Sequence, residues 1–179
     1  LDLFQAAALT TTLSSLLKLS ATATLSSTSG PYSASNCVDG DLGEFGRNIC
    51  HSNTESNPSL TLDLGSAKQI AYVAVYNRRD CCRDRLGRYT VSLRLGSSDA
   101  WTLCSEETAG RDAFEPLLST CPQLAQYVRV QLPGDDRTLV LTEVEVYRAT
   151  VVLVAVAKRS AALALAAALA LTLTAAALA

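Results

Sequence analysis

Apolar and polar residues alternate along several short stretches of this chain, and residues that favour turns separate those stretches. A period of two is typical of a β-strand with one buried face. The alternating stretches are residues 17–25, 60–64, 70–76, 89–95, 127–132 and 139–147. In the last of them, Val144 and Val146 face one side while Glu143, Glu145 and Tyr147 face the other. No convincing amphipathic helix precedes residue 150, so the pattern predicts an all-β fold, an antiparallel β-sandwich or jelly roll.

The length and composition allow one folded domain with flanking segments, because 179 residues with 49% hydrophobic and 18% charged side chains can bury one core. We expect that domain at residues 16–148. Residues 1–15 carry few charges and are interpreted as a linker or the end of a preceding region. Residues 26–57 are rich in Gly, Pro, Asn, Ser and Asp and should run as loops over one end of the domain. Long ordered loops usually carry function.

The tail at residues 149–179 is rich in Val, Ala and Leu, and its last 19 residues, 161–179, carry no charge. Since this length can span a bilayer, we expect the tail to be helical. Three interpretations stay open: a membrane anchor preceded by Lys158 and Arg159, a cleaved lipid-anchor signal, and a disordered low-complexity segment. The polar spacer expected of a lipid-anchor signal is missing.

Residues 77–85 read Asn-Arg-Arg-Asp-Cys-Cys-Arg-Asp-Arg and lie between two predicted strands. Arginine stays charged at any relevant pH and presents a rigid fork of hydrogen-bond donors. Four arginines in nine residues therefore need anionic partners or a ligand rich in oxygen acceptors. A disulfide between the neighbours Cys81 and Cys82 would close a small ring and offer a rigid, flat, apolar surface.

The charge and the cysteines exclude some classes of protein. The formal net charge of −2 argues against a nucleic-acid binder, because the chain has no basic excess to neutralise phosphates. Six cysteines without the spacing of a metal or redox motif favour a disulfide framework. Such a framework predicts an oxidising compartment, and hence an extracellular or cell-surface protein.

The only histidine, His51, follows Cys50 near the end of the polar loops. A lone loop histidine is more often structural than functional. Together with Arg78-x-Asp80-x4-Arg85 around the paired cysteines, however, it resembles the signature of the F-type lectins, or fucolectins, in the discoidin-like superfamily. The resemblance covers about residues 16–148 and takes in the segments 36–40, 62–65 and 143–147. It implies a discoidin-like jelly-roll sandwich.

The resemblance also implies a carbohydrate-binding site. In the family, a histidine and two arginines hydrogen-bond the ring oxygen and hydroxyls of L-fucose, and a vicinal disulfide packs against one edge of the sugar. The matching residues are His51, Arg78, Arg85, Cys81 and Cys82. Charged donors suit this task, since each hydrogen bond to a charged group contributes roughly 1.5 to 3 kcal/mol.

Four neighbouring residues have lesser expected roles. Phe45 is the best candidate to enclose the fucose methyl group. Asp80 is expected to position the arginines, because close guanidinium groups would otherwise repel each other. Arg79 and Arg83 fall outside the motif and are interpreted as solvated loop charges or contacts to extended glycans.

Members of the family also place a calcium ion beneath the binding loops. The implied ligands are Asn36, Asp39, Asp41, Glu143 and, through the backbone only, Ile49 and Thr142. Calcium prefers six to eight oxygens, which carboxylates and carbonyls could supply. Ile49 stands where the family has a hydroxyl ligand, and Thr142 where it has a cysteine. Without the resemblance, an Asn-x-x-Asp-Gly run is commonly just a turn.

The cysteine missing at Thr142 leaves Cys50 without its usual partner. Cys37 lies inside the calcium segment instead, so we expect a Cys37–Cys50 disulfide. The other expected pairs are Cys81–Cys82 and Cys104–Cys121. Each longer bridge closes a loop of roughly 15 residues, worth about 3 kcal/mol in the chain-entropy model.

The leading hypothesis is a calcium-stabilised, non-catalytic lectin that binds terminal L-fucose on glycans or glycoproteins. The alternative is a discoidin-like adhesion module that binds protein or lipid. An enzyme is disfavoured, because nothing pairs two carboxylates around a cleft or sets a nucleophile beside His51. Avidity would come from tandem domains, an oligomer or membrane attachment through the tail.

Overall fold

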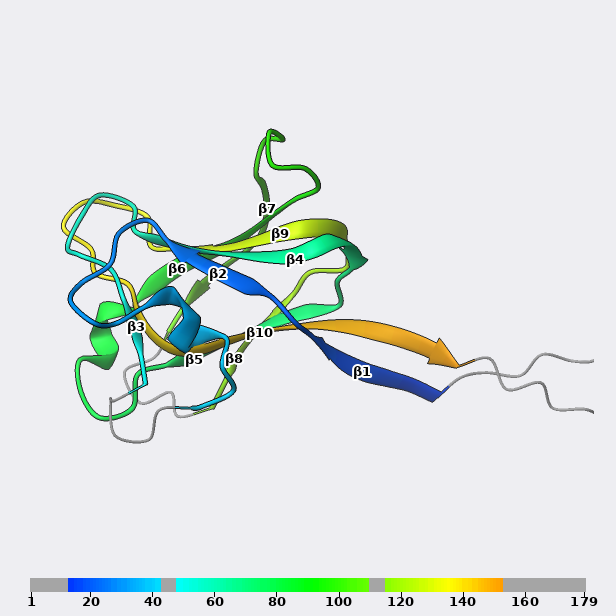
Figure 1. Cartoon of the computed structure of the whole chain (residues 1–179), viewed down its shortest axis with the longest axis horizontal. Helices are drawn as coiled ribbons and strands as arrows, with labels where there is room; N and C mark the ends of the chain where they lie inside the picture. The colour runs from blue at the N-terminus through cyan, green and yellow to red at the C-terminus, as the bar shows by residue number, and fades with distance from the viewer. Residues whose placement is uncertain (1–12, 43–47, 110–114, 153–179) are drawn as a thin grey trace, which may run out of the picture. The chain divides into compact units, whose positions relative to one another are not determined.

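In the part of the chain that the structure describes, two antiparallel sheets of five strands each form a β-sandwich (Figure 1). The computed structural model describes residues 13–42, 48–109 and 115–152, and residues Leu16–Thr150 form one compact unit. The elements are β1 (Leu13–Leu19), β2 (Thr22–Leu25), η1 (Ala34–Cys37), β3 (Cys50–His51), β4 (Ser59–Gln69), β5 (Tyr72–Asn77), η2 (Arg83–Arg85), β6 (Arg88–Arg94), β7 (Thr102–Thr108), β8 (Leu117–Thr120), β9 (Leu124–Gln131) and β10 (Val140–Val152). One sheet has the order β1-β10-β5-β8 with β3 paired to β10, and the other β2-β4-β9-β6-β7. The predicted all-β antiparallel sandwich is confirmed.

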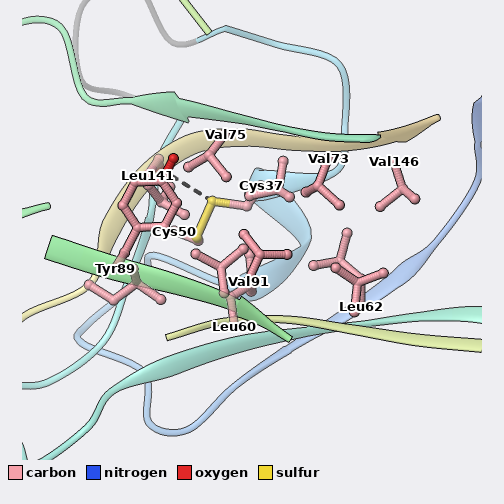
Figure 2. Packing of buried hydrophobic residues seen from close by; sticks show 14 of the residues in the cluster. Cys37, Cys50, Leu60, Leu62, Val73, Val75, Tyr89, Val91, Leu141 and Val146 are labelled. Atoms are coloured by element: carbon pink, nitrogen blue, oxygen red, sulfur yellow. Dashed lines mark hydrogen bonds between the residues drawn. A yellow bond between two sulfur atoms is a disulfide. The ribbon is translucent and has the colours of Figure 1, made fainter. Parts of the chain in front are cut away.

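The core lies between the two sheets. Figure 2 shows Val73, Val75 and Val146 projecting from one sheet toward Leu60 and Leu62 of the other. All five side chains are buried. They are alternate residues of their strands, so the period-two pattern marks the inner face of each sheet.

The predicted single strand at residues 17–25 is wrong in one respect. The chain forms two strands there, β1 beside β10 in one sheet and β2 beside β4 in the other. It crosses between the layers at Ser20 and Ala21. Leu19, Ala21 and Ala23 still pack against the core, because both sheets present their inner faces to it. The alternation therefore continues through a change of sheet.

Three of the described strands escaped prediction: β7, β8 and the two-residue β3, which lies within the stretch predicted to run as loops. None of the seven residues of β7 is buried, so the strand lacks an apolar face that could produce a periodic signal. In β8 only Ser119 is buried, while Leu118 is largely exposed. Strand formation here depends on pairing with β6 and β5 respectively. Pairing between residues far apart in the chain cannot be predicted from the local sequence pattern.

β10 positions the loops at one end of the sandwich. Leu141 is in register with Cys50 of β3 and also with Asn77 of β5. The strand thus holds His51, the residue after Cys50, on one side and the base of the loop after Asn77 on the other. A bulge between Leu141 and Glu143 marks this point in the ladder with β5.

Phe45 lies outside the described ranges, as do residues 1–12 of the predicted linker and residues 153–179 of the predicted helical tail. The described ends of those two segments are strand instead, since residues 13–15 belong to β1 and residues 149–152 to β10. In the part of the chain that the structure describes, no helix is long and apolar enough to cross a membrane.

Candidate functional site

Asn77 anchors the arginine-rich loop at the end of β5. Its side chain is buried, with 4% of the residue exposed. Strand alternation predicts an apolar side chain at such a position and does not explain an amide there. The amide oxygen accepts a hydrogen bond from the Arg78 backbone N–H (2.8 Å), and the amide nitrogen donates to the Arg83 carbonyl (3.0 Å). The hydroxyl of Thr142 on β10 donates to the Tyr76 carbonyl at 3.2 Å. Both ends of the loop are therefore tied to the sheet.

Arg78 and Asp80 form a bidentate ion pair within this loop. The Arg78 Nε and Nη2 atoms donate to the two carboxylate oxygens of Asp80, at 2.6 and 2.8 Å. Hydrogen bonding to Arg78 lowers the pKa of Asp80 to about 2 and raises the pKa of Arg78 above its ordinary value. This contact is the one expected of a carboxylate that positions an arginine.

His51 and Arg85 meet from opposite sides of β10. His51 Nδ1 lies 2.6 Å from the Ser52 carbonyl oxygen, which can only accept, so Nδ1 carries the proton. In a neutral ring Nε2 is then an acceptor, and it faces Arg85 Nη1 at 3.3 Å. Tyr32 stacks on the imidazole with ring centroids 5.8 Å apart. The structure thus brings together two of the three side chains predicted to hydrogen-bond the sugar, and the Ser52 contact indicates the tautomer of His51.

Sequence reasoning missed Arg137, which lies in the turn before β10. Its Nη2 donates to the carbonyls of Leu86 (3.1 Å), Arg85 and Arg88 (both 3.3 Å), and its Nη1 donates to Pro133 (3.0 Å). One guanidinium thereby fixes the backbone that follows the arginine-rich loop. No local pattern distinguishes Arg137 from a solvated turn residue, so only the fold could reveal this contact.

The paired cysteines differ from the prediction. Cys81 and Cys82 are free thiols in the structure, so the expected vicinal disulfide is not formed. Cys82 adopts the left-handed backbone conformation (φ 56°, ψ 29°), which is uncommon for a residue other than glycine. The two thiols instead interact by hydrogen bonding, which raises the pKa of Cys81. They line a shallow depression of about 450 Å³ with their neighbours Asp80, Arg83 and Asp84.

Arg83 faces the inside of its own loop. Its Nε donates to the Arg79 carbonyl oxygen at 3.1 Å, and its Nη2 bonds the same oxygen. This contact corrects the expectation of a solvated charge at Arg83. The guanidinium instead closes the loop upon itself.

Two disulfides match the sequence prediction. Cys37 is bonded to Cys50, 13 residues apart, and Cys104 to Cys121, 17 residues apart. Cys37 and Cys50 are fully buried, and Figure 2 shows their bridge within the apolar core. The bridge braces the segment that presents His51.

The residues expected to bind calcium do not fit that ion as they are arranged. Glu143 Oε1 accepts from the Gly40 N–H at 3.2 Å and from the Lys18 ammonium at 3.3 Å. Asp39 and Asp41 each accept from the Asn48 side-chain amide at 2.9 Å. Within the described ranges, no three acidic, histidine or cysteine side chains gather as metal ligands would.

The comparison with known families decides the relationship. Residues 36–130 match the family described as "NedA-like, galactose-binding domain". The chain belongs to this F5/F8 type C family. Within this galactose-binding-like family, it is 30% identical to a fucolectin of Anguilla anguilla over 122 residues, which make up 63% of this chain and 75% of the relative.

Two further comparisons concern the same domain. The chain is 32% identical to the pentraxin fusion protein of Xenopus laevis over 119 residues, 64% of this chain but only 26% of the relative's length. It also resembles the lectin domain of lectinolysin, solved in complex with Lewis B antigen, with a TM-score of 0.63 and 29% identity. That match covers 73% of this chain and 94% of the lectin domain. The F-type lectin resemblance is confirmed, and the chain is a carbohydrate-binding lectin domain related to the fucolectins.

Proposed function

We propose that this domain binds terminal L-fucose on glycans, without catalysis, through His51 and the loop at residues 77–85. The contact between His51 Nε2 and Arg85 Nη1 carries the proposal, because it joins a directed acceptor and a charged donor on one exposed surface. The similar lectin domain of lectinolysin was solved with Lewis B antigen, a fucosylated glycan.

The chemistry of the site suits a neutral sugar. Hydroxyl oxygens accept from guanidinium groups, and a sugar hydroxyl that took the place of Arg85 Nη1 could donate to Nε2 of His51. Arg78 is held by Asp80, so little side-chain freedom would be lost when a ligand binds. The Cys81 and Cys82 side chains supply apolar surface beside these donors, and the fucose methyl and ring edge would pack there.

The disulfides bear on the compartment in which the domain works, and the small size of one sugar bears on how tightly a single domain can bind. Two buried or partly buried disulfides are typical of a secreted or cell-surface protein. Contacts with one sugar are few, so strong attachment to a glycoprotein would come from several linked or clustered copies. Attachment through the hydrophobic tail would provide such clustering.

A binding comparison with matched glycans tests the proposal. The 179-residue chain would be titrated with Lewis B oligosaccharide and with the same core lacking fucose, by isothermal calorimetry. The proposal expects saturable binding of the fucosylated glycan alone. Equal binding of both glycans, or binding of neither, would contradict it.

A further inference from the structure

Lys18 of β1 reaches two acidic side chains of the neighbouring strand β10. Its Nζ lies 2.6 Å from Glu145 Oε1 and 3.3 Å from Glu143 Oε1. The Glu143 side chain is 0% exposed and that of Glu145 is 11% exposed, whereas Lys18 keeps 41% of its side chain exposed. One partly solvated cation therefore faces two carboxylates that are almost out of contact with water.

A buried carboxylate needs a nearby positive charge, since an uncompensated charge is costly in the interior of a protein. Glu145 has further support, because its Oε2 accepts hydrogen bonds from Tyr76 and Tyr147, both at 2.8 Å. Glu143 has less. Its Oε1 accepts from the Gly40 N–H, and its Oε2 is buried with no hydrogen-bond partner in the described part of the chain. Among the described residues, Lys18 supplies the only ion pair to Glu143.

Oxygens of three other residues expected to bind calcium, Asp39, Asp41 and Ile49, accept hydrogen bonds from side-chain amides. The Asn48 amide nitrogen lies 2.9 Å from one carboxylate oxygen of each of Asp39 and Asp41. The Asn36 amide nitrogen donates to the Ile49 carbonyl oxygen at 3.0 Å. Each of these donors takes up one of the two lone pairs on its oxygen and so competes with a cation for it.

A cavity of about 390 Å³ contains the opposed charges. Lys18, Asp39, Gly40 and Glu143 are among the residues that line it. The ammonium thus lies in the same hollow as the carboxylates that a metal ion would have to bridge. A metal ion that bound Glu143 Oε1 there would have to displace Lys18.

We propose that Lys18 is a built-in cation that takes the place of calcium in this domain. Its ammonium compensates the buried Glu143 and Glu145, joins β1 to β10, and stabilises the loop at residues 36–41 through Glu143 and the Gly40 N–H. The domain then folds without a metal ion. The inference concerns folding and metal binding, and it stands or falls independently of the sugar specificity.

The first test uses the 179-residue chain without substitution. Calcium chloride is titrated to about 10 mM, an order of magnitude above the roughly 1 mM dissociation constants of weak extracellular calcium modules. Calorimetry should detect no saturable binding, and the midpoint of thermal unfolding should be the same in calcium and in a chelator. Saturable binding of one calcium ion with a raised midpoint would overturn the inference.

The second test assigns the role to Lys18. Lys18→Met leaves Glu143 without its cation and should lower the unfolding midpoint by about 5 to 15 °C, whereas Lys18→Arg should retain most of the stability. Lys68→Met is the matched control, since Lys68 takes part in no ion pair among the described residues. A Lys18→Met midpoint equal to that of Lys68→Met would overturn the inference. If Lys18→Met does not fold, Lys18→Arg decides. A folded Lys18→Arg protein would show that the positive charge is what the fold requires, and an unfolded one would count against the inference.

Discussion

Arg85 Nη1 lies 3.3 Å from His51 Nε2, although 34 positions separate the two residues in the chain. The contact exists because β10 pairs with β3 on one side and with β5 on the other. The proposed sugar site is therefore a product of strand order. His51 in β3 and Arg85 in η2 come from separate segments of the chain that β10 holds together.

Arg85→Gln should weaken binding of a fucosylated glycan by roughly 10- to 150-fold, because a charged hydrogen bond worth about 1.5 to 3 kcal/mol is lost. Arg85 is exposed, so the free energy of unfolding should change by less than about 0.5 kcal/mol. Calorimetric titration and chemical denaturation measure the two quantities. Arg88→Gln is the control, since Arg88 is an exposed arginine in an ion pair with Glu106. A large loss of stability with Arg85→Gln would mark Arg85 as structural.

Asp80→Asn should produce a stability difference that depends on pH. The pKa of Asp80 is lowered from 3.8 to about 2 by its hydrogen bonds to Arg78. The stabilisation is therefore fully present above pH 3.8 and is lost as the pH falls through about 2. The pair is partly exposed, so the difference at pH 6 should stay below about 1 kcal/mol. Thermal unfolding of both proteins between pH 6 and pH 2 should show the curves converging, and a constant gap would count against this assignment.

The two disulfides should differ in their effect on binding. Removing either by paired alanine substitution should destabilise the fold by about 3 kcal/mol in the chain-entropy model. Only loss of the Cys37–Cys50 bridge should also weaken glycan binding, because Cys50 precedes His51 in β3. The Cys104–Cys121 pair serves as the matched control. Equal affinities in the two folded variants would show that the bridge does not brace His51.

Arg137→Lys should loosen the backbone after the arginine-rich loop. Lysine keeps the charge but lacks the fork that reaches the carbonyls of Arg85, Leu86 and Arg88. Hydrogen exchange at residues 85–88 should become faster, and glycan affinity should fall because Arg85 is less well positioned. Unchanged exchange with full affinity would exclude a positioning role for Arg137.

Much of the fold could be predicted because buried strands carry their own signal. The alternation in β4, β5, β6, β9 and β10 reflects one face packed against a shared core. β7 has no buried residue and so has no such signal. Glu143 shows the limit more clearly. Alternation places it on the face opposite Val144, yet it is fully buried, because Lys18 and the loop at Gly40 cover that face.

The candidate site, too, could be predicted only in part from the sequence. Arg78, Asp80 and Arg85 lie in one short segment whose composition is itself unusual, so the sequence could single them out. Tyr32 against His51, Arg137 beneath the loop and Lys18 against Glu143 all join distant segments. Such contacts depend on sheet order and on side-chain reach, which local sequence patterns do not encode.

The most direct test of the central claim is an NMR titration of the isotope-labelled chain with L-fucose, with D-glucose as the control. The account predicts saturable shifts in the His51 ring and in the amides of residues 78–85, with none of comparable size from glucose. Shifts confined to other parts of the molecule, or no shift at saturating fucose, would contradict it.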